Sequence, residues 1–206
     1  MNMKANRLLR VGLIGVLSLS VAGCMTKLPS LAHQDQVTGS LVVGRILTVL
    51  TGERTRRYGP QIRFLELEDQ DSSKRFHVEI ESPDQRFAIS LPPGKYQLTR
   101  VQISEGPFMS MADLSMAFSV DAGAVTYVGT WRFEVDSPRY GRMVAVTVVV
   151  DQAESARVRD FLAEQYPKLN GRSMIETLPQ PTMTNVRLYE VMPYPRYPTY
   201  FRRKWW

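Results

Sequence analysis

Few residues in this chain could carry chemistry, and most of them lack partners at a useful spacing. The sequence contains one cysteine, Cys24, and two histidines, His33 and His77. A zinc site needs several cysteine or histidine ligands close together, and no such cluster occurs in the sequence. It also lacks a G-x-S-x-G nucleophile elbow and a phosphate-binding glycine loop. We therefore expect no catalytic residue, no metal site and no cofactor.

Two stretches raise weaker metal hypotheses. The acidic residues between Glu66 and Asp71 could form a calcium loop, but they lack the glycine-centred ligand spacing of such loops, so a solvated hairpin tip is the better interpretation. Residues 105–116, EGPFMSMADLSM, carry three methionines in a predicted loop that leads into a strand. Thioethers can bind Cu(I), yet no histidine or cysteine lies nearby. A partner contact or core packing is favoured there.

The single cysteine follows a segment with the layout of a secretory signal peptide. Residues 1–10 contain three basic residues and no acidic one, and the next twelve, VGLIGVLSLSVA, carry no charge. A membrane-spanning helix needs about 20 apolar residues, and this run is shorter and ends in small residues. A buried core helix would show polar positions at helical spacing, and none occurs before Ser18. We therefore interpret residues 1–23 as a signal peptide.

The segment Val21-Ala22-Gly23-Cys24 resembles the lipobox of bacterial lipoproteins. The resemblance implies cleavage between Gly23 and Cys24, a diacylglyceryl group on the Cys24 sulfur and acylation of the new amino terminus. Two or three acyl chains, each contributing about 0.8 kcal/mol per buried methylene, would hold the protein firmly at a membrane. Met25 stands where inner-membrane lipoproteins commonly carry aspartate. We therefore expect attachment to the outer membrane on its periplasmic side.

The distribution of charge along the chain argues against a nucleic-acid partner. Loss of Lys4, Arg7 and Arg10 with the signal peptide lowers the formal net charge from +6 to +3. The remaining positive charge lies mainly in residues 184–206, which hold five basic residues and one acidic residue. A nucleic-acid-binding protein would spread a basic patch over its folded surface. We expect the partner to be an envelope protein or a glycan.

From Val37 to Val150 apolar and polar residues alternate with a period of two, which is typical of half-buried strands. Polar turns and Pro93-Gly94 separate these runs at short intervals. This pattern predicts a mainly β protein, an antiparallel β-sandwich of about eight strands. The predicted strands are residues 39–50, 61–67, 76–80, 87–91, 96–103, 116–120, 125–136 and 143–150.

The clearest alternation lies in residues 125–136, VTYVGTWRFEVD. Arg132 and Glu134 are expected to face solvent. The residues expected to share one buried face are Val125, Tyr127, Trp131, Phe133 and Val135.

Residues 151–171 predict one amphipathic helix, because apolar residues recur there at intervals of three and four. Asp151 could cap its start, and Pro167 and Gly171 mark its end. We expect this helix to pack on the sandwich and to close an open end or an edge. A helix that binds a partner is the alternative interpretation.

Two stretches resemble the carboxypeptidase-regulatory-like or transthyretin-like β-sandwich modules of bacterial surface and periplasmic proteins. They are LPPGKYQLTRVQI, residues 91–103, and FSVDAGAVTYVGTWRF, residues 118–133. The resemblance covers about residues 37–150 and implies a sandwich that acts as a scaffold or interaction domain. It implies no catalytic residue.

The end of the chain is rich in proline, aromatic and basic residues. Prolines at 193, 195 and 198 exclude a regular helix and favour an extended conformation. Three interpretations stay open: a disordered tail, a segment packed along the sandwich, or a docking peptide for a protein, glycan or membrane surface. The candidate partner-binding residues are Tyr194, Tyr197, Tyr200, Phe201, Trp205 and Trp206.

The sequence therefore predicts a lipid-anchored envelope lipoprotein that acts as a non-enzymatic interaction or assembly module. The alternative is an enzyme or ligand carrier whose site no motif reveals. The expected organisation is a signal peptide (1–23), a tether (24–36), a β-sandwich domain (37–150), a packed helix (151–171) and an extended tail (172–206).

Overall fold

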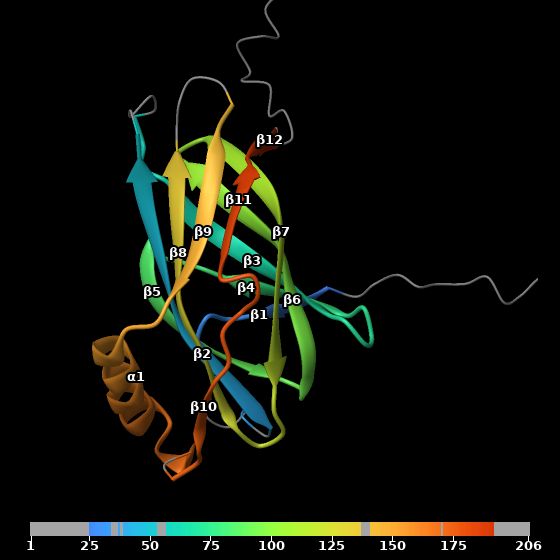
Figure 1. Ribbon diagram of the computed structural model, residues 1–206, viewed down its shortest axis with the longest axis vertical. Helices are drawn as coiled ribbons and strands as arrows, with labels where there is room; N and C mark the ends of the chain where they lie inside the picture. Colours follow the sequence, from blue (N-terminus) through green and yellow to red (C-terminus); the bar gives the residue numbers. More distant parts are fainter. Residues whose placement is uncertain are drawn as a thin grey trace, which may run out of the picture.

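The computed structural model describes residues 25–33, 37, 39–52, 57–136, 141–169 and 171–191. Most of these residues lie in strands, and one helix follows them near the carboxyl end (Figure 1). The elements are β1 (Thr26–Leu28), β2 (Ser40–Thr51), β3 (Gln61–Asp69), β4 (Arg75–Glu79), β5 (Asp84–Leu91), β6 (Gly94–Glu105), β7 (Phe108–Val120), β8 (Val125–Asp136), β9 (Met143–Val149), α1 (Gln152–Gln165), η2 (Pro167–Leu169), β10 (Met174–Glu176), β11 (Met183–Arg187) and β12 (Tyr189–Val191).

Two packed sheets confirm the predicted β-sandwich. The first sheet has the order β1-β4-β3-β6-β7-β12, and the second has the order β11-β9-β8-β2-β5 with β10 also paired to β8. Most neighbours are antiparallel, but β1–β4, β2–β8 and β8–β10 are parallel, so the sheets are mixed rather than purely antiparallel. The alternation of apolar and polar residues within a strand does not show whether a neighbouring strand that is remote in the sequence runs parallel or antiparallel to it. All eight predicted strands are present.

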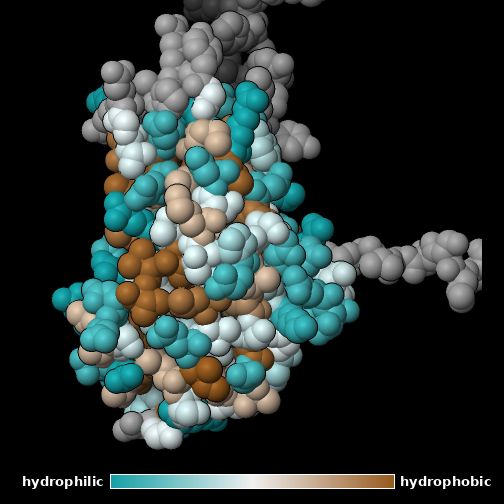
Figure 2. Space-filling view, viewed as in Figure 1, coloured by the Kyte–Doolittle hydropathy of each residue, from teal (hydrophilic) through white to brown (hydrophobic). Residues whose placement is uncertain are grey.

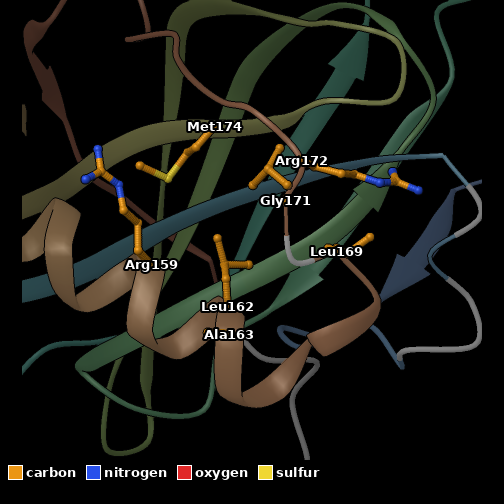
Figure 3. A pocket seen from close by; sticks show the side chains of 8 residues that line it. Arg159, Leu162, Ala163, Leu169, Gly171, Arg172 and Met174 are labelled. Atoms are coloured by element: carbon orange, nitrogen blue, oxygen red, sulfur yellow. The ribbon is translucent and has the colours of Figure 1, made fainter.

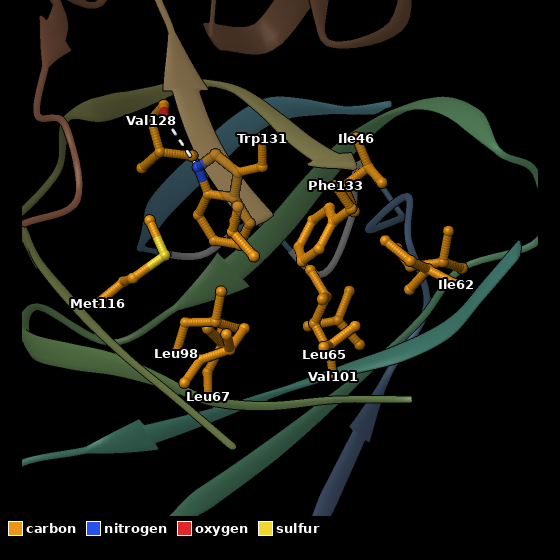
Figure 4. Close-up of a cluster of buried hydrophobic side chains, with 14 of the residues drawn as sticks. Ile46, Ile62, Leu65, Leu67, Leu98, Val101, Met116, Val128, Trp131 and Phe133 are labelled. Atoms are coloured by element: carbon orange, nitrogen blue, oxygen red, sulfur yellow. Dashed lines mark hydrogen bonds between the residues drawn. The ribbon is translucent and has the colours of Figure 1, made fainter. Parts of the chain in front are cut away.

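The core lies between the two sheets and is built around Trp131 of β8 (Figure 4). Its indole packs between Phe87 and Phe118, with ring centroids 5.4 and 6.0 Å away. The indole N–H donates to the Val128 carbonyl at 2.9 Å, so its one polar atom is satisfied inside the core. Tyr96 is also buried there, and this burial raises its pKa to about 12.

A bulge in β8 changes which side chains face the core. Val43 pairs with Tyr127 and Arg45 pairs with Thr130, so two residues of β8 stand opposite Gly44 alone. Gly129 takes φ +78°, a conformation that favours glycine. The extra residue shifts the alternation of β8 by one position, so odd-numbered residues before and after the bulge face opposite sides of the sheet. Trp131, Phe133 and Val135 face the core between the sheets as predicted, but the prediction that Val125 and Tyr127 share that face is wrong, because they lie on the outer face of the second sheet under α1.

The segments at both ends of the described chain are paired with the outer strands of the sandwich. β1 pairs with β4 at the edge of the first sheet, and a few residues later Leu31 bridges to Ala88 on the edge strand of the second sheet. At the other side β11 pairs with β9, and β12 pairs with β7. Unpaired edge groups favour such additions. Residues 26–31 of the predicted tether and residues 183–191 of the predicted tail are therefore paired with the sandwich.

Helix α1 starts as predicted, with the Asp151 side chain accepting from the Ala153 N–H at 2.9 Å. The helix does not close an end or an edge of the sandwich. It packs on the outer face of the second sheet, where Val158 contacts a small second core that includes Leu41 and Tyr127 (Figure 1). That face can receive a helix because the bulge turns apolar side chains outward. Among the described residues, no helix has the length and apolar character needed to cross a bilayer.

Candidate functional site

The residues predicted to bind lipid or a partner lie outside the described residues. They are Gly23, Cys24, Tyr194, Tyr197, Tyr200, Phe201, Trp205 and Trp206. Their neighbours in the chain are described: β1 begins at Thr26, and β12 ends at Val191. Both strands lie at the edges of the first sheet, at opposite sides.

Cys24 is very close in the chain to the folded domain. Two peptide units separate it from Thr26, so their Cα atoms can be at most about 7.6 Å apart. Thr26 and Leu28 are in register with Phe76 and Val78 of β4. An exposed ion pair of 3.6 Å joins Lys27 to Glu79. Any group attached at Cys24 would therefore hold this edge of the sandwich.

A pocket lies between α1 and the outer face of the second sheet, and we call it the α1 pocket (Figure 3). Its volume is about 290 Å³. Helix α1 supplies one wall, and β8, β10, η2 and the segment after η2 supply the rest. The lining residues are Val125, Arg159, Leu162, Ala163, Leu169, Gly171, Arg172 and Met174.

Two arginines stand at opposite ends of the α1 pocket and differ in their contacts. Figure 3 shows the Arg172 side chain extending away from Arg159. Arg172 donates to the carbonyls of Gly39 and Gly123 at 3.0 and 3.3 Å. Arg159 is exposed and forms no ion pair with an acidic residue of the described part of the chain. Arg159 is therefore the cation that could receive an acidic group.

A buried carboxylate fixes α1 on the sheet. Glu154, in the first turn, accepts from Arg45 of β2 at 3.1 Å and from Arg86 of β5 at 2.9 Å. Arg157 adds a longer contact of 3.5 Å from the helix itself. Arg45 also donates to Asp84, and this hydrogen bond lowers the pKa of the Asp84 carboxyl. Sequence reasoning missed Glu154, because its partners are remote in the sequence and an acidic residue in a first turn is ordinary.

Sequence reasoning also missed a second buried ion pair. Arg142, just before β9, donates to Glu105 at the end of β6 and to the Ser110 hydroxyl of β7, the latter at 2.9 Å. Only 6% of the Arg142 side chain and 2% of the Glu105 side chain are exposed. The Arg142 carbonyl accepts from the Leu188 N–H, between β11 and β12. This pair therefore joins the two sheets and the last described segment at one end of the sandwich.

A shallow polar hollow of about 490 Å³ lies on the outer face of the first sheet. His77 lines it beside Phe64, with ring centroids 3.9 Å apart, and burial lowers the His77 pKa. His77 is therefore half-buried rather than exposed as predicted, while His33 is exposed as predicted. Within the described residues, no three histidine, cysteine, aspartate or glutamate side chains are grouped to hold a metal ion.

The methionine-rich stretch was predicted to be a loop, but most of it lies in a strand. Residues 108–120 form β7, with Met116 buried in the core and Met109 and Met111 half-buried. Met111 and Met109 pair with Tyr189 and Val191 of β12.

The acidic run does form a hairpin tip as predicted, where Asp69 accepts from the N–H groups of the turn.

Some exposed apolar side chains gather near the end of β9. Val149 and Val150 are exposed there, and Met183 of β11 lies across from Thr147 of β9. Figure 2 shows hydrophobic atoms on this part of the surface, above α1 in the view.

The sequence matches no family model and no curated protein, and the fold matches no solved structure. The resemblances to bacterial lipoproteins and to carboxypeptidase-regulatory-like modules stay predictions.

Proposed function

We propose that this protein is a lipoprotein anchored at Cys24 to the periplasmic face of the outer membrane, and that its sandwich is a non-enzymatic interaction or assembly module. The observation that carries this proposal is that β1, an edge strand of the first sheet, begins two residues after Cys24 in the chain. Acyl chains on Cys24 would hold the first sheet by its β1 edge, directly at the membrane surface. A module so placed is suited to contacts within the envelope rather than to reaching distant partners.

The position of β12 supports a partner-binding role for the tail. β1 and β12 are the two outermost strands of the first sheet, with four strands between them. At about 4.8 Å per strand spacing, the tail starts roughly 24 Å across the sheet from the anchored edge. Residues 192–206 would then begin at the edge opposite the lipid. The tail's tyrosines and tryptophans offer large contact areas, and each of their rings carries a polar group. Phe201 adds contact area without a polar group.

Replacing Cys24 by alanine tests the anchor. The Cys24→Ala protein should take up no radioactive palmitate and should leave the membrane fraction, because the sulfur that carries the diacylglyceryl group is gone. The measurement is palmitate labelling of intact cells followed by membrane fractionation. Ser18→Ala, which keeps the cysteine, is the control. A wild-type protein that takes up no label and fractionates as soluble would contradict the proposal.

Deleting residues 193–206 tests the tail. The deletion should change the melting temperature by only a few degrees, because the strand that pairs with β7 ends at Val191. It should remove cross-links to other envelope components formed in intact cells. A large drop in melting temperature with unchanged cross-links would mean that the tail completes the fold instead of contacting a partner.

A ligand carrier is the second candidate function, and the α1 pocket is the observation that favours it. The pocket combines apolar walls with one exposed arginine that lacks an acidic partner among the described residues. Sites for small molecules usually have such a composition.

A further inference from the structure

We propose that the α1 pocket binds a small amphiphile with a single acyl chain and an acidic head group. The chain would lie between α1 and β10, and the head group would contact the Arg159 guanidinium. This site is separate from the Cys24 anchor and does not depend on it.

The walls of the pocket suit an acyl chain. Leu162 and Met174 face each other across the pocket in Figure 3, and Leu169 and Val125, which are both buried, also line it. These side chains come from the helix, from β10, from η2 and from β8. A volume of about 290 Å³ lies at the lower end of the range for small-molecule sites, so a short chain fits better than a long one.

The charges around the pocket select the head group. Two arginines and no acidic residue line it. Arg172 already donates to two backbone carbonyls, and these contacts hold the segment after η2 against the loops before β2 and β8. Arg159 has its guanidinium available at the other end. Guanidinium groups bind carboxylates and phosphates through charge-assisted hydrogen bonds, so an anionic head is favoured over a neutral or cationic one.

The pocket is preformed because both of its sides are fixed. Glu154 holds the start of α1 through Arg45 and Arg86. After the helix, the Tyr166 hydroxyl donates to the Ala32 carbonyl at 2.8 Å, which ties this end to the amino-terminal segment. A ligand would therefore not have to order the helix on binding, and this raises the affinity that a small ligand can reach.

Photo-cross-linking of the purified full chain with a diazirine analogue of decanoate tests the site. Mass spectrometry would locate the label, and the concentration for half-maximal labelling would give an apparent Kd. We expect labelled peptides within residues 159–174. An octanoate analogue, two methylenes shorter, should bind about fifteenfold more weakly, because each buried methylene changes affinity by about fourfold. Decyl phosphate should compete with the probe, and decyl trimethylammonium should not.

Three variants separate this pocket from other apolar surfaces. Ala163→Phe fills the pocket from the exposed side of α1 and should abolish labelling of residues 159–174. Arg159→Glu should raise the apparent Kd by about fivefold or more. Arg187→Glu makes the same charge change on exposed β11 and should leave the Kd unchanged. Melting curves equal to wild type would show that each variant is folded.

Three results would overturn the proposal. One is label found only outside residues 159–174, which would mean that the probe binds another apolar surface. Another is unchanged labelling in Ala163→Phe. The third is equal competition by the anionic and cationic amphiphiles, which would remove Arg159 from the site. Because palmitate uptake at Cys24 is measured separately, each of these results leaves the proposed anchor untouched.

Discussion

Trp131→Ala should be among the most destabilising single substitutions in this protein. The side chain is only 1% exposed and fills the space between Phe87 and Phe118. Truncating a buried tryptophan to alanine costs about 3–5 kcal/mol, and the Val128 carbonyl also loses its indole donor. For a domain of this size such a loss lowers the melting temperature by about 10 °C or more. Thermal unfolding followed by circular dichroism measures the effect.

Two further variants make this prediction specific. Trp131→Phe keeps an aromatic ring in the core and should lose less stability than Trp131→Ala. Met183→Ala shortens a side chain that is 64% exposed on β11 and should leave the melting temperature within a few degrees. If Trp131→Ala melted like wild type, the face assigned to β8 after the bulge would be incorrect.

Arg142→Met should destabilise the protein by a similar amount for a different reason. The substitution removes the guanidinium that the buried Glu105 carboxylate contacts. Removing one partner of a buried ion pair costs about 3–5 kcal/mol, mostly because the remaining charge has lost its solvation. Urea unfolding of wild type and variant measures the change in the free energy of unfolding. Arg187→Met, at an exposed position on β11, is the control and should have little effect.

The double variant Glu105→Leu, Arg142→Met distinguishes the pair from ordinary packing. With both charges removed, neither of them stays buried without the other, so the double variant should be more stable than Arg142→Met alone. A double-mutant cycle then gives a coupling energy of more than about 1 kcal/mol. Additive effects of the two single substitutions would mean that Glu105 and Arg142 act independently.

Local patterns predicted the elements of the fold well. Alternation of apolar and polar residues located the eight strands from β2 to β9, because a strand with one buried face must repeat every two residues. Asp151 marked the helix start, because a carboxylate before a helix can accept from its first N–H groups. Trp131, Phe133 and Val135 were assigned to the correct face.

The errors arose where a remote contact overrides a local pattern. Val125 and Tyr127 have the same odd spacing as Trp131, and only the extra residue at Gly129 sends them to the other face. The short strands β1, β10 and β12 have three residues each, too few to show a period, and the five-residue β11 was also missed. They form because the edges of longer strands offer unpaired backbone groups.

The candidate sites show the same contrast between local features, which the sequence determines, and contacts between remote residues, which the fold determines. The sequence alone determined the signal-like start, the position of Cys24 behind it and the aromatic tail, because a signal segment and its processing site are properties of a short linear stretch. Only the tertiary structure showed that the strand beginning at Thr26 is an edge strand and that Arg159 lines a largely apolar pocket. A pocket is made by side chains from several elements, and Val125 and Met174 come together only because β10 pairs with β8. Such proximity depends on which strands pair, and strand pairing is decided by the packing of the whole sandwich rather than by any one segment.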